Sequence, residues 1–121
     1  LMVSILVVDD ARFMRVMLKE ILKSTVPDVN IVEAADTVSA VEMYNQEKPD
    51  LVTMDMNLPG TDGITCMKDI LKINPKAKVL MVSAVDQQKV MYDAMNAGAR
   101  GYIHKPFNKV GIMSKVKELL N

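Results

Sequence analysis

The chain has 121 residues, half of them hydrophobic and 25% of them charged, which is the composition of one ordinary globular domain. Its 15 Lys and Arg residues balance its 15 Asp and Glu residues, which argues against the net basic face that nucleic-acid or membrane-surface binding needs. The single cysteine excludes an internal disulfide, and no apolar run is long enough for a membrane span or a signal peptide. We therefore expect a cytoplasmic protein that binds neither nucleic acid nor membranes.

Short apolar runs alternate with amphipathic stretches over the whole chain. In chain order, we predict a strand at 5–8, a helix through 14–22, an edge strand at 29–34, a helix after residue 36, a strand at 51–54, a helix through 64–71, a strand at 79–82, a helix from about 87 to 98, a strand at 101–104 and a helix through 112–120. This alternation predicts right-handed crossovers and a parallel sheet covered on both faces. We expect one domain over residues 1–121, with no output domain.

Two finer expectations concern burial. Asp36 can cap the second helix, whose inward positions we expect to be Val38, Val41 and Tyr44. The run at 79–82 is the most hydrophobic strand candidate, so we place this strand centrally in the sheet.

Polar residues directly follow four of the five predicted strands: Asp9 and Asp10, Asp55, Ser83, and Lys105. Ligands of open α/β sheets bind outside the carboxyl ends of the strands, so we expect these side chains to share one site. Three neighbouring carboxylates repel one another, and Lys105 with a divalent cation such as Mg²⁺ would relieve that repulsion. Such a site can receive a phosphoryl group on Asp55, whose oxygens Lys105 and the metal would neutralise and Ser83 would hydrogen-bond.

These motifs, in this order and each at a strand end, resemble the receiver domains of two-component response regulators. The matching segments are Asp9-Asp10, residues 55–63 with Asn57-Leu58-Pro59-Gly60, Ser83-Ala84, and Lys105-Pro106-Phe107. The resemblance covers residues 3–121. It implies a flavodoxin-like, doubly wound, five-stranded parallel sheet with strand order 2-1-3-4-5 and helices on both faces.

The resemblance also implies a metal site. Asp55 would be the phosphoacceptor and, with Asp10, a side-chain ligand of Mg²⁺. The backbone carbonyl of Asn57 would be a third protein ligand. Asp9 would hold a metal-bound water or assist the chemistry.

Three further residues receive roles from the resemblance. Ser83 would hydrogen-bond the phosphoryl group, and Lys105 would pair with its oxygens. Tyr102 occupies the position of the switch aromatic, which turns inward when Ser83 moves. The Lys105-Pro106 bond is cis in similar proteins. A protein of this kind is a signalling switch rather than an enzyme, since it catalyses only its own phosphorylation and dephosphorylation.

Within the family, residues 9–15 resemble the chemotaxis branch, the CheY-like proteins. This implies a histidine kinase of the CheA type as phosphodonor. The downstream partner would be a FliM-like motor switch protein or a CheF-like archaeal adaptor, and the residues do not decide between them. The expected contact face combines the fourth helix, fifth strand and fifth helix, at about 87–96, 101–102 and 108–111, on a monomer.

Other functions compete with this interpretation. A single-domain regulator of another phosphorelay would carry the same motifs. Asp55-Met56-Asn57 superficially resembles the nucleophile pair of haloacid-dehalogenase-type phosphatases, although that nucleophile follows the first strand and here it follows the third. A flavodoxin-like flavin binder needs a glycine- and hydroxyl-rich first loop, whereas Asp9-Asp10 would repel phosphate. We expect the only histidine, His104, to be structural and Cys66 to be inert.

Overall fold

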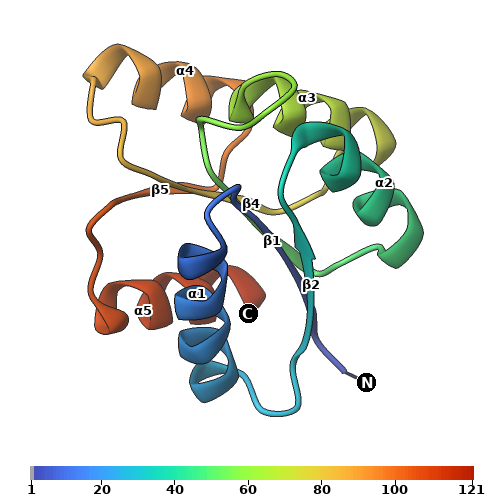
Figure 1. Cartoon of the computed structure of the whole chain (residues 1–121), viewed down its shortest axis with the longest axis vertical. Coiled ribbons are helices and arrows are strands. Elements are labelled where there is room, and N and C mark those ends of the chain that lie inside the picture. Colours follow the sequence, from blue (N-terminus) through green and yellow to red (C-terminus); the bar gives the residue numbers. More distant parts are fainter. Residues whose placement is uncertain (1) are drawn as a thin grey trace.

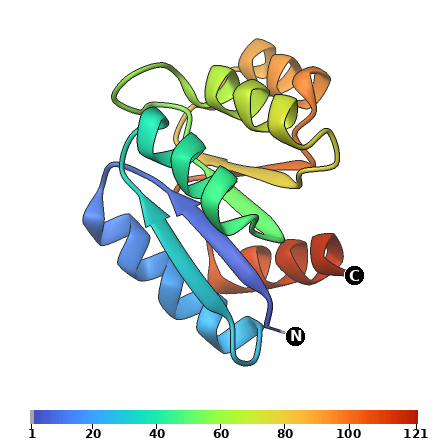
Figure 2. The same cartoon turned by 90° about the vertical axis from the view of Figure 1, so that its right-hand side faces the viewer.

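The computed structural model describes residues 2–121, in which five strands alternate with five helices (Figure 1). The elements are β1 (Ser4–Val8), α1 (Arg12–Thr25), β2 (Asn30–Ala34), α2 (Thr37–Glu47), β3 (Leu51–Met54), α3 (Gly63–Ile73), β4 (Val79–Ser83), α4 (Gln88–Ala97), β5 (Gly101–His104) and α5 (Lys109–Leu120). All paired strands are parallel, and the order β2-β1-β3-β4-β5 confirms the expected topology. Figure 2 shows the edge strand β2 beside β1.

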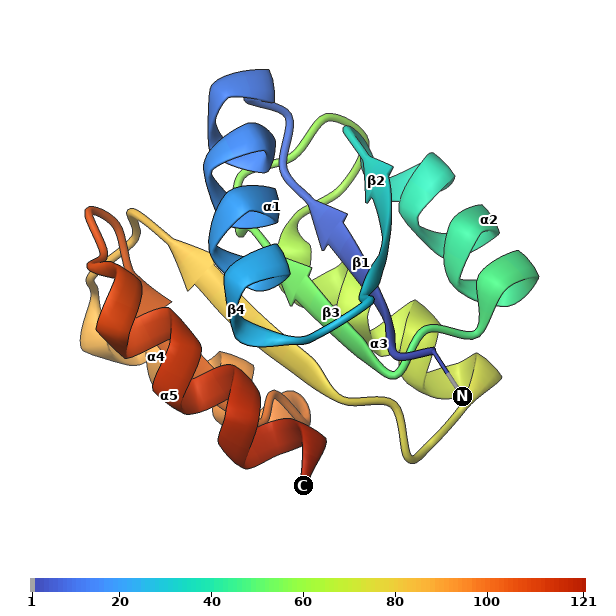
Figure 3. The ribbon, with the colours of Figure 1, turned by 90° about the horizontal axis from the view of Figure 1, so that it is seen from below.

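The sheet separates two hydrophobic layers. Helices α1 and α5 pack on one face, and α2, α3 and α4 pack on the other, as Figures 1 and 3 both show. Along β1, Leu6 and Val8 enter the α2–α4 layer while Ile5 and Val7 enter the α1–α5 layer, because successive side chains of a strand point to opposite faces. Burial on both faces explains why β1 reads as an unbroken apolar run.

The most hydrophobic strand, β4, is an interior strand between β3 and β5. The middle position belongs to β3, which is flanked by β1 and β4. The placement of this strand in the interior of the sheet, in the order 2-1-3-4-5, is therefore confirmed.

The inward face of α2 differs from the prediction. Val38 is 65% exposed, whereas Thr37, Ala40 and Tyr44 are buried and Val41 is partly buried. Residues on one helix face recur three and four apart, so the face that contains Tyr44 also contains Ala40 and Thr37 and turns Val38 toward solvent. The expectation for Val38 was wrong because side-chain hydrophobicity alone does not fix the phase of a short helix.

Three helices begin with a capped first turn at the carboxyl edge of the sheet. The side chains of Asp36, Asp62 and Asn108 each accept a hydrogen bond from the backbone N–H three residues further on, at 2.7, 2.9 and 2.7 Å. The cap predicted at Asp36 is thus confirmed. Gly98 directly follows α4 with φ 121°, an angle that favours glycine. Among residues 2–121, no helix is both long and apolar enough to cross a membrane.

Candidate functional site

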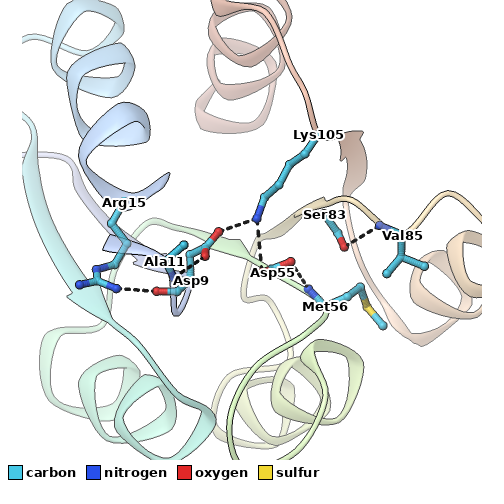
Figure 4. A network of polar contacts seen from close by, with 8 residues as sticks. All are labelled: Asp9, Ala11, Arg15, Asp55, Met56, Ser83, Val85 and Lys105. Atoms are coloured by element: carbon cyan, nitrogen blue, oxygen red, sulfur yellow. Dashed lines mark hydrogen bonds and ion pairs between the residues drawn. The ribbon is translucent and has the colours of Figure 1, made fainter. Parts of the chain in front are cut away.

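The five polar residues that follow the apolar runs gather at the carboxyl edge of the sheet. Asp9 and Asp10 follow β1, Asp55 follows β3, Lys105 follows β5, and Ser83 is the last residue of β4. Figure 4 shows the side chains of Asp9, Asp55 and Lys105 pointing toward one another. Residues 96 positions apart in the sequence are therefore in direct contact.

Three carboxylates share a small volume with one ammonium group. Asp9, Asp10 and Asp55 each offer an oxygen within 4.8 Å of the others. Asp9 and Asp55 are 2% and 7% exposed, while Asp10 is exposed. The Nζ of Lys105 lies 2.7 Å from Oδ2 of Asp9 and 3.3 Å from Oδ2 of Asp55. One cation thus bridges two buried acids and leaves an excess of negative charge.

Backbone groups orient the two buried carboxylates. The N–H of Ala11 donates to Oδ1 of Asp9 at 2.9 Å, and the N–H of Met56 donates to Oδ1 of Asp55 at 2.8 Å. Each acid therefore uses one oxygen locally and turns Oδ2 toward Lys105. Gly63, the first residue of α3, packs so closely on the backbone carbonyl of Asp55 that any side chain there would collide with it.

Burial is the main influence on the pKa of Asp55. Loss of solvation raises the pKa of Asp55; Lys105 opposes this, and the nearby Asp9 carboxylate adds to it, so the pKa lies above its ordinary value. The ionised form is therefore incompletely stabilised by the protein alone. A hard divalent cation with oxygen ligands would supply the missing charge, and carboxylates with waters are the donors that Mg²⁺ prefers. The residues present fit such an ion.

Ser83 and Tyr102 meet through the backbone of Val85. The Val85 N–H donates to Oγ of Ser83 at 3.1 Å, and the hydroxyl of Tyr102 donates to the carbonyl of Val85 at 2.7 Å (Figure 4 shows the first of these). Ser83 is fully buried and Tyr102 is partly buried. Burial is also the main cause that raises the pKa of Tyr102. The loop after β4 therefore links the two residues predicted to form the switch.

Other predicted residues lie beside this cluster rather than in it. Asn57 is exposed two residues beyond Asp55, where its backbone pairs antiparallel with Asp62. The peptide bond between Lys105 and Pro106 is cis.

The two side chains expected to have no chemical role also lie apart from the cluster. His104 is exposed at the end of β5, with its ring centroid 5.4 Å from that of Tyr102. Cys66 is fully buried between helices, and burial raises the pKa of its thiol to about 12.

Arg15 makes two contacts near the site that the sequence did not reveal. Its Nη1 donates to the backbone carbonyl of Asp9 at 2.8 Å, and its Nε lies 2.9 Å from Oε1 of Glu33 (Figure 4 shows the first contact). Arg15 therefore ties the loop after β1 to β2. Nothing in its spacing marks this role, because its target is a backbone atom.

The fold and the site together define a class of protein. It is a doubly wound α/β domain with a cluster of carboxylates and one lysine at the carboxyl edge of its parallel sheet. The family model for the response regulator receiver domain matches residues 5–117. The chemotaxis protein CheY of Bacillus subtilis is 44% identical over 117 residues, covering 97% of each chain. The CheY of Thermotoga maritima is 45% identical, covering 97% of this chain and 93% of its own.

A solved structure agrees with these sequences. A Borrelia burgdorferi CheX–CheY–BeF3–Mg²⁺ complex contains a chain with a TM-score of 0.91 and 32% identity, covering 98% of this chain and 90% of that one. The chain belongs to the response regulator receiver domain family. It is a receiver domain of the CheY type, a signalling switch of phosphorelay and chemotaxis systems. This assignment disfavours the phosphatase and flavin-binding alternatives.

Proposed function

We propose that Asp55 accepts a phosphoryl group and that the modified domain switches its contact face to bind a partner. The observation that carries this proposal is a nearly buried carboxylate that shares one lysine with a second buried acid. Asp10 and Asp55 would hold Mg²⁺ through their side chains, Asn57 through its backbone carbonyl and Asp9 through a bound water. The BeF3 and Mg²⁺ of the similar Borrelia complex support both assignments.

The residues suit transfer to a carboxylate. An oxygen of Asp55 attacks phosphorus, a new P–O bond forms, and the bond to the donor's leaving group breaks with its electron pair. Bound Mg²⁺ supplies charge neutralisation for the phosphoryl oxygens. Lys105, already 3.3 Å from Asp55, stabilises the charge that modification adds. The Met56 N–H keeps the Asp55 carboxylate in a fixed orientation during attack.

Switching follows from the shared contact at Val85. When the hydroxyl of Ser83 turns toward the phosphoryl group, the hydrogen bond that it accepts from the Val85 N–H breaks. The loop is then free to move toward the site, and the bond between the Tyr102 hydroxyl and the Val85 carbonyl changes with it. The ring of Tyr102 turns inward and alters the face formed by α4, β5 and α5. Two packings that differ by a few kcal/mol would respond to one or two charge-assisted bonds.

The same face has the character of a partner-binding surface. Tyr92 and Met95 on α4 and Val110 on α5 are 66%, 46% and 73% exposed. We propose a CheA-type histidine kinase as phosphodonor and a FliM-like switch protein or a CheF-like adaptor as target. A CheX-type protein is a further candidate, since the Borrelia neighbour is bound to one. We further propose that residues 1–121 form one receiver domain, which acts in the cytoplasm as a monomer. The alternative to a chemotaxis role is regulation of another phosphorelay.

Mass spectrometry after incubation with acetyl phosphate tests the phosphoacceptor. The wild-type protein should gain one phosphoryl group only when Mg²⁺ is present, and Asp55→Asn should gain none. Asp69→Asn is the matched control, because Asp69 is a partly buried carboxylate on α3 that pairs with Lys72. It should be labelled like the wild type.

Labelling of Asp55→Asn at the wild-type rate would remove Asp55 from its role. Labelling that ignores chelation of the metal would remove the proposed magnesium site.

A further inference from the structure

One side chain of α2 holds the tip of the loop that follows Asp55. The N–H of Thr37 donates to the carbonyl of Pro59 at 3.1 Å, and Oγ1 of Thr37 accepts from the N–H of Thr61 at 3.1 Å. Thr37 is only 5% exposed. Its two hydrogen bonds therefore hold the loop on both sides of Gly60, although Thr37 lies 24 residues before Thr61 in the sequence.

Gly60, at the tip of the loop, allows the close approach to Thr37. Gly60 has φ 104°, a conformation that L side chains rarely adopt. A Cβ atom at Gly60 would also collide with Oγ1 of Thr37. The tip thus comes close enough to Thr37 that only glycine fits between the two hydrogen bonds.

Thr37 is itself held firmly. It is the first residue of α2, where backbone N–H groups lack partners within the helix and so remain available to other acceptors. Its carbonyl accepts a hydrogen bond from the buried thiol of Cys66 on α3, at 3.8 Å. Thr37 therefore joins α2, α3 and the loop at one point.

The tip and the acidic cluster are mechanically connected. At the base of the loop, Asn57 pairs antiparallel with Asp62, and the N–H of Gly63 donates to the carbonyl of Met56 at 2.8 Å. The segment between is closed at its base by these pairings and held at its tip by Thr37. Asn57 therefore lies at the base of a short closed loop whose tip is held by Thr37, two residues from Asp55.

We propose that Thr37 is a positioning residue of the magnesium site. Its hydroxyl holds the loop so that the backbone carbonyl of Asn57 keeps its place beside Asp55. This inference rests on the proposed function, in which Asn57 is a metal ligand. It adds that the affinity for Mg²⁺ depends on a residue that touches neither the metal nor the phosphoryl group.

Thr37→Val tests the proposal because valine retains the branched shape and removes the hydroxyl. The Thr61 N–H then loses its acceptor, and its amide hydrogen exchange should accelerate about tenfold, as followed by NMR without metal. The dissociation constant for Mg²⁺, measured by calorimetry on unphosphorylated protein, should rise about three- to tenfold.

Two variants serve as controls. Thr37→Ser keeps the hydroxyl and should restore both the exchange rate of Thr61 and most of the affinity for Mg²⁺. Thr25→Val removes another buried threonine hydroxyl, which donates to the carbonyl of Ile21 within α1 at 2.7 Å. It should leave both readouts at wild-type values, which separates positioning from a general loss of stability.

A Thr37→Val protein that binds Mg²⁺ as tightly as the wild type would overturn the proposal, whether or not exchange at Thr61 changes. Gly60→Ala decides the matter if Thr37→Val does not fold, because it displaces the tip from the other side and should also weaken Mg²⁺ binding. Unchanged affinity there would overturn the proposal as well. Failure of the proposed function looks different: the wild type itself would then bind no Mg²⁺ and accept no phosphoryl group.

Discussion

Two clusters of three charged side chains lie close together, and they are built in opposite ways. The acidic cluster contains two carboxylates and one ammonium group: Asp9, Asp55 and Lys105. The basic cluster contains one carboxylate and two cations: Glu33, Arg15 and Lys19. The exposed Asp10 adds one more negative charge to the first cluster. The basic cluster has more than enough cations for its acid, whereas the acidic cluster has too few.

A lysine lowers the pKa of its carboxylate partner in both clusters, yet the net shifts of Glu33 and Asp55 are opposite. In the basic cluster, the hydrogen bond from Lys19 is the main cause that lowers the pKa of Glu33, whose side chain is 34% exposed. In the acidic cluster, burial raises the pKa of Asp55 although Lys105 lies 3.3 Å from its carboxylate. Burial and a like-charged neighbour together outweigh one lysine. A buried cluster with an excess of negative charge is therefore a candidate site for a metal cation, and the bound cation would in turn make room for the charge of a phosphoryl group.

Removal of one lysine from each cluster gives the largest expected contrast. Lys105→Ala leaves Asp9 and Asp55 buried without a cation, so the free energy of unfolding should fall by about 3 kcal/mol in metal-free buffer. Lys19→Ala leaves Glu33 with Arg15, and the loss should stay below about 1 kcal/mol. Urea titration of both variants, with and without Mg²⁺, measures the difference.

Added Mg²⁺ should recover part of the stability lost in Lys105→Ala and none of that lost in Lys19→Ala. Equal losses in the two variants would show that the acidic cluster is already balanced, and the case for a bound cation would weaken.

The next largest change in the free energy of unfolding is expected at Thr53. Here the group concerned is an uncharged hydroxyl. The Thr53 side chain is 1% exposed, and Oγ1 has no hydrogen-bond partner within residues 2–121. Thr53→Val should raise the free energy of unfolding by about 1 kcal/mol, because a buried hydroxyl without a partner is costly. Thr25→Val should bring no such gain, since that hydroxyl is paired with the Ile21 carbonyl. A loss of stability in Thr53→Val would show that the Thr53 hydroxyl has a partner in solution.

The sheet and the acidic cluster could be predicted because both depend on local pattern. Apolar runs such as 79–82 mark strands, and polar residues after them must meet once the strands are parallel. The side chains of Asp9, Asp55 and Lys105 follow from that rule alone. Their hydrogen bonds to Ala11 and Met56 do not, because they depend on loop conformation.

The errors and omissions share a physical cause. Val38 was assigned inward on hydrophobicity, but the phase of α2 is set by Tyr44 and its neighbours one and two turns earlier. Arg15 and Thr37 act through backbone atoms of Asp9 and of the loop after β3. A side chain that recognises a backbone atom leaves no signature in the identity of its partner, so a single sequence cannot reveal it.

Glu33 gives a smaller, pH-dependent effect. The pKa of Glu33 is lowered in the folded protein, so its ion pairs stabilise the fold above the unfolded value of 4.5, and this stability is lost as the pH falls through the folded pKa. Wild type should exceed Glu33→Gln in unfolding free energy at pH 7 by less than about 1 kcal/mol, since the pair is partly exposed. The difference should shrink as the pH falls below 4.5 and when salt is added.

Denaturant titrations of both proteins from pH 7 to pH 3 measure it. A difference that grows toward low pH would contradict the sign of the pKa shift. Labelling of Asp55 by acetyl phosphate should be unchanged in Glu33→Gln.

The last effect, at Cys66, concerns chemical reactivity rather than stability, because burial without any counter-charge keeps its thiol neutral. The thiol is fully buried, and its pKa is raised to about 12 by burial first and by the carboxylates of Asp69, Asp62 and Asp36. Alkylation of the native protein by iodoacetamide should therefore be at least about a hundredfold slower than in denaturant at the same pH, and its rate should still be rising at pH 10, where an ordinary thiol has reached its plateau. Rapid alkylation with an ordinary thiol pH profile would mean that α3 opens from α2 in solution, and the thiol that helps to fix Thr37 would then be too mobile to hold it.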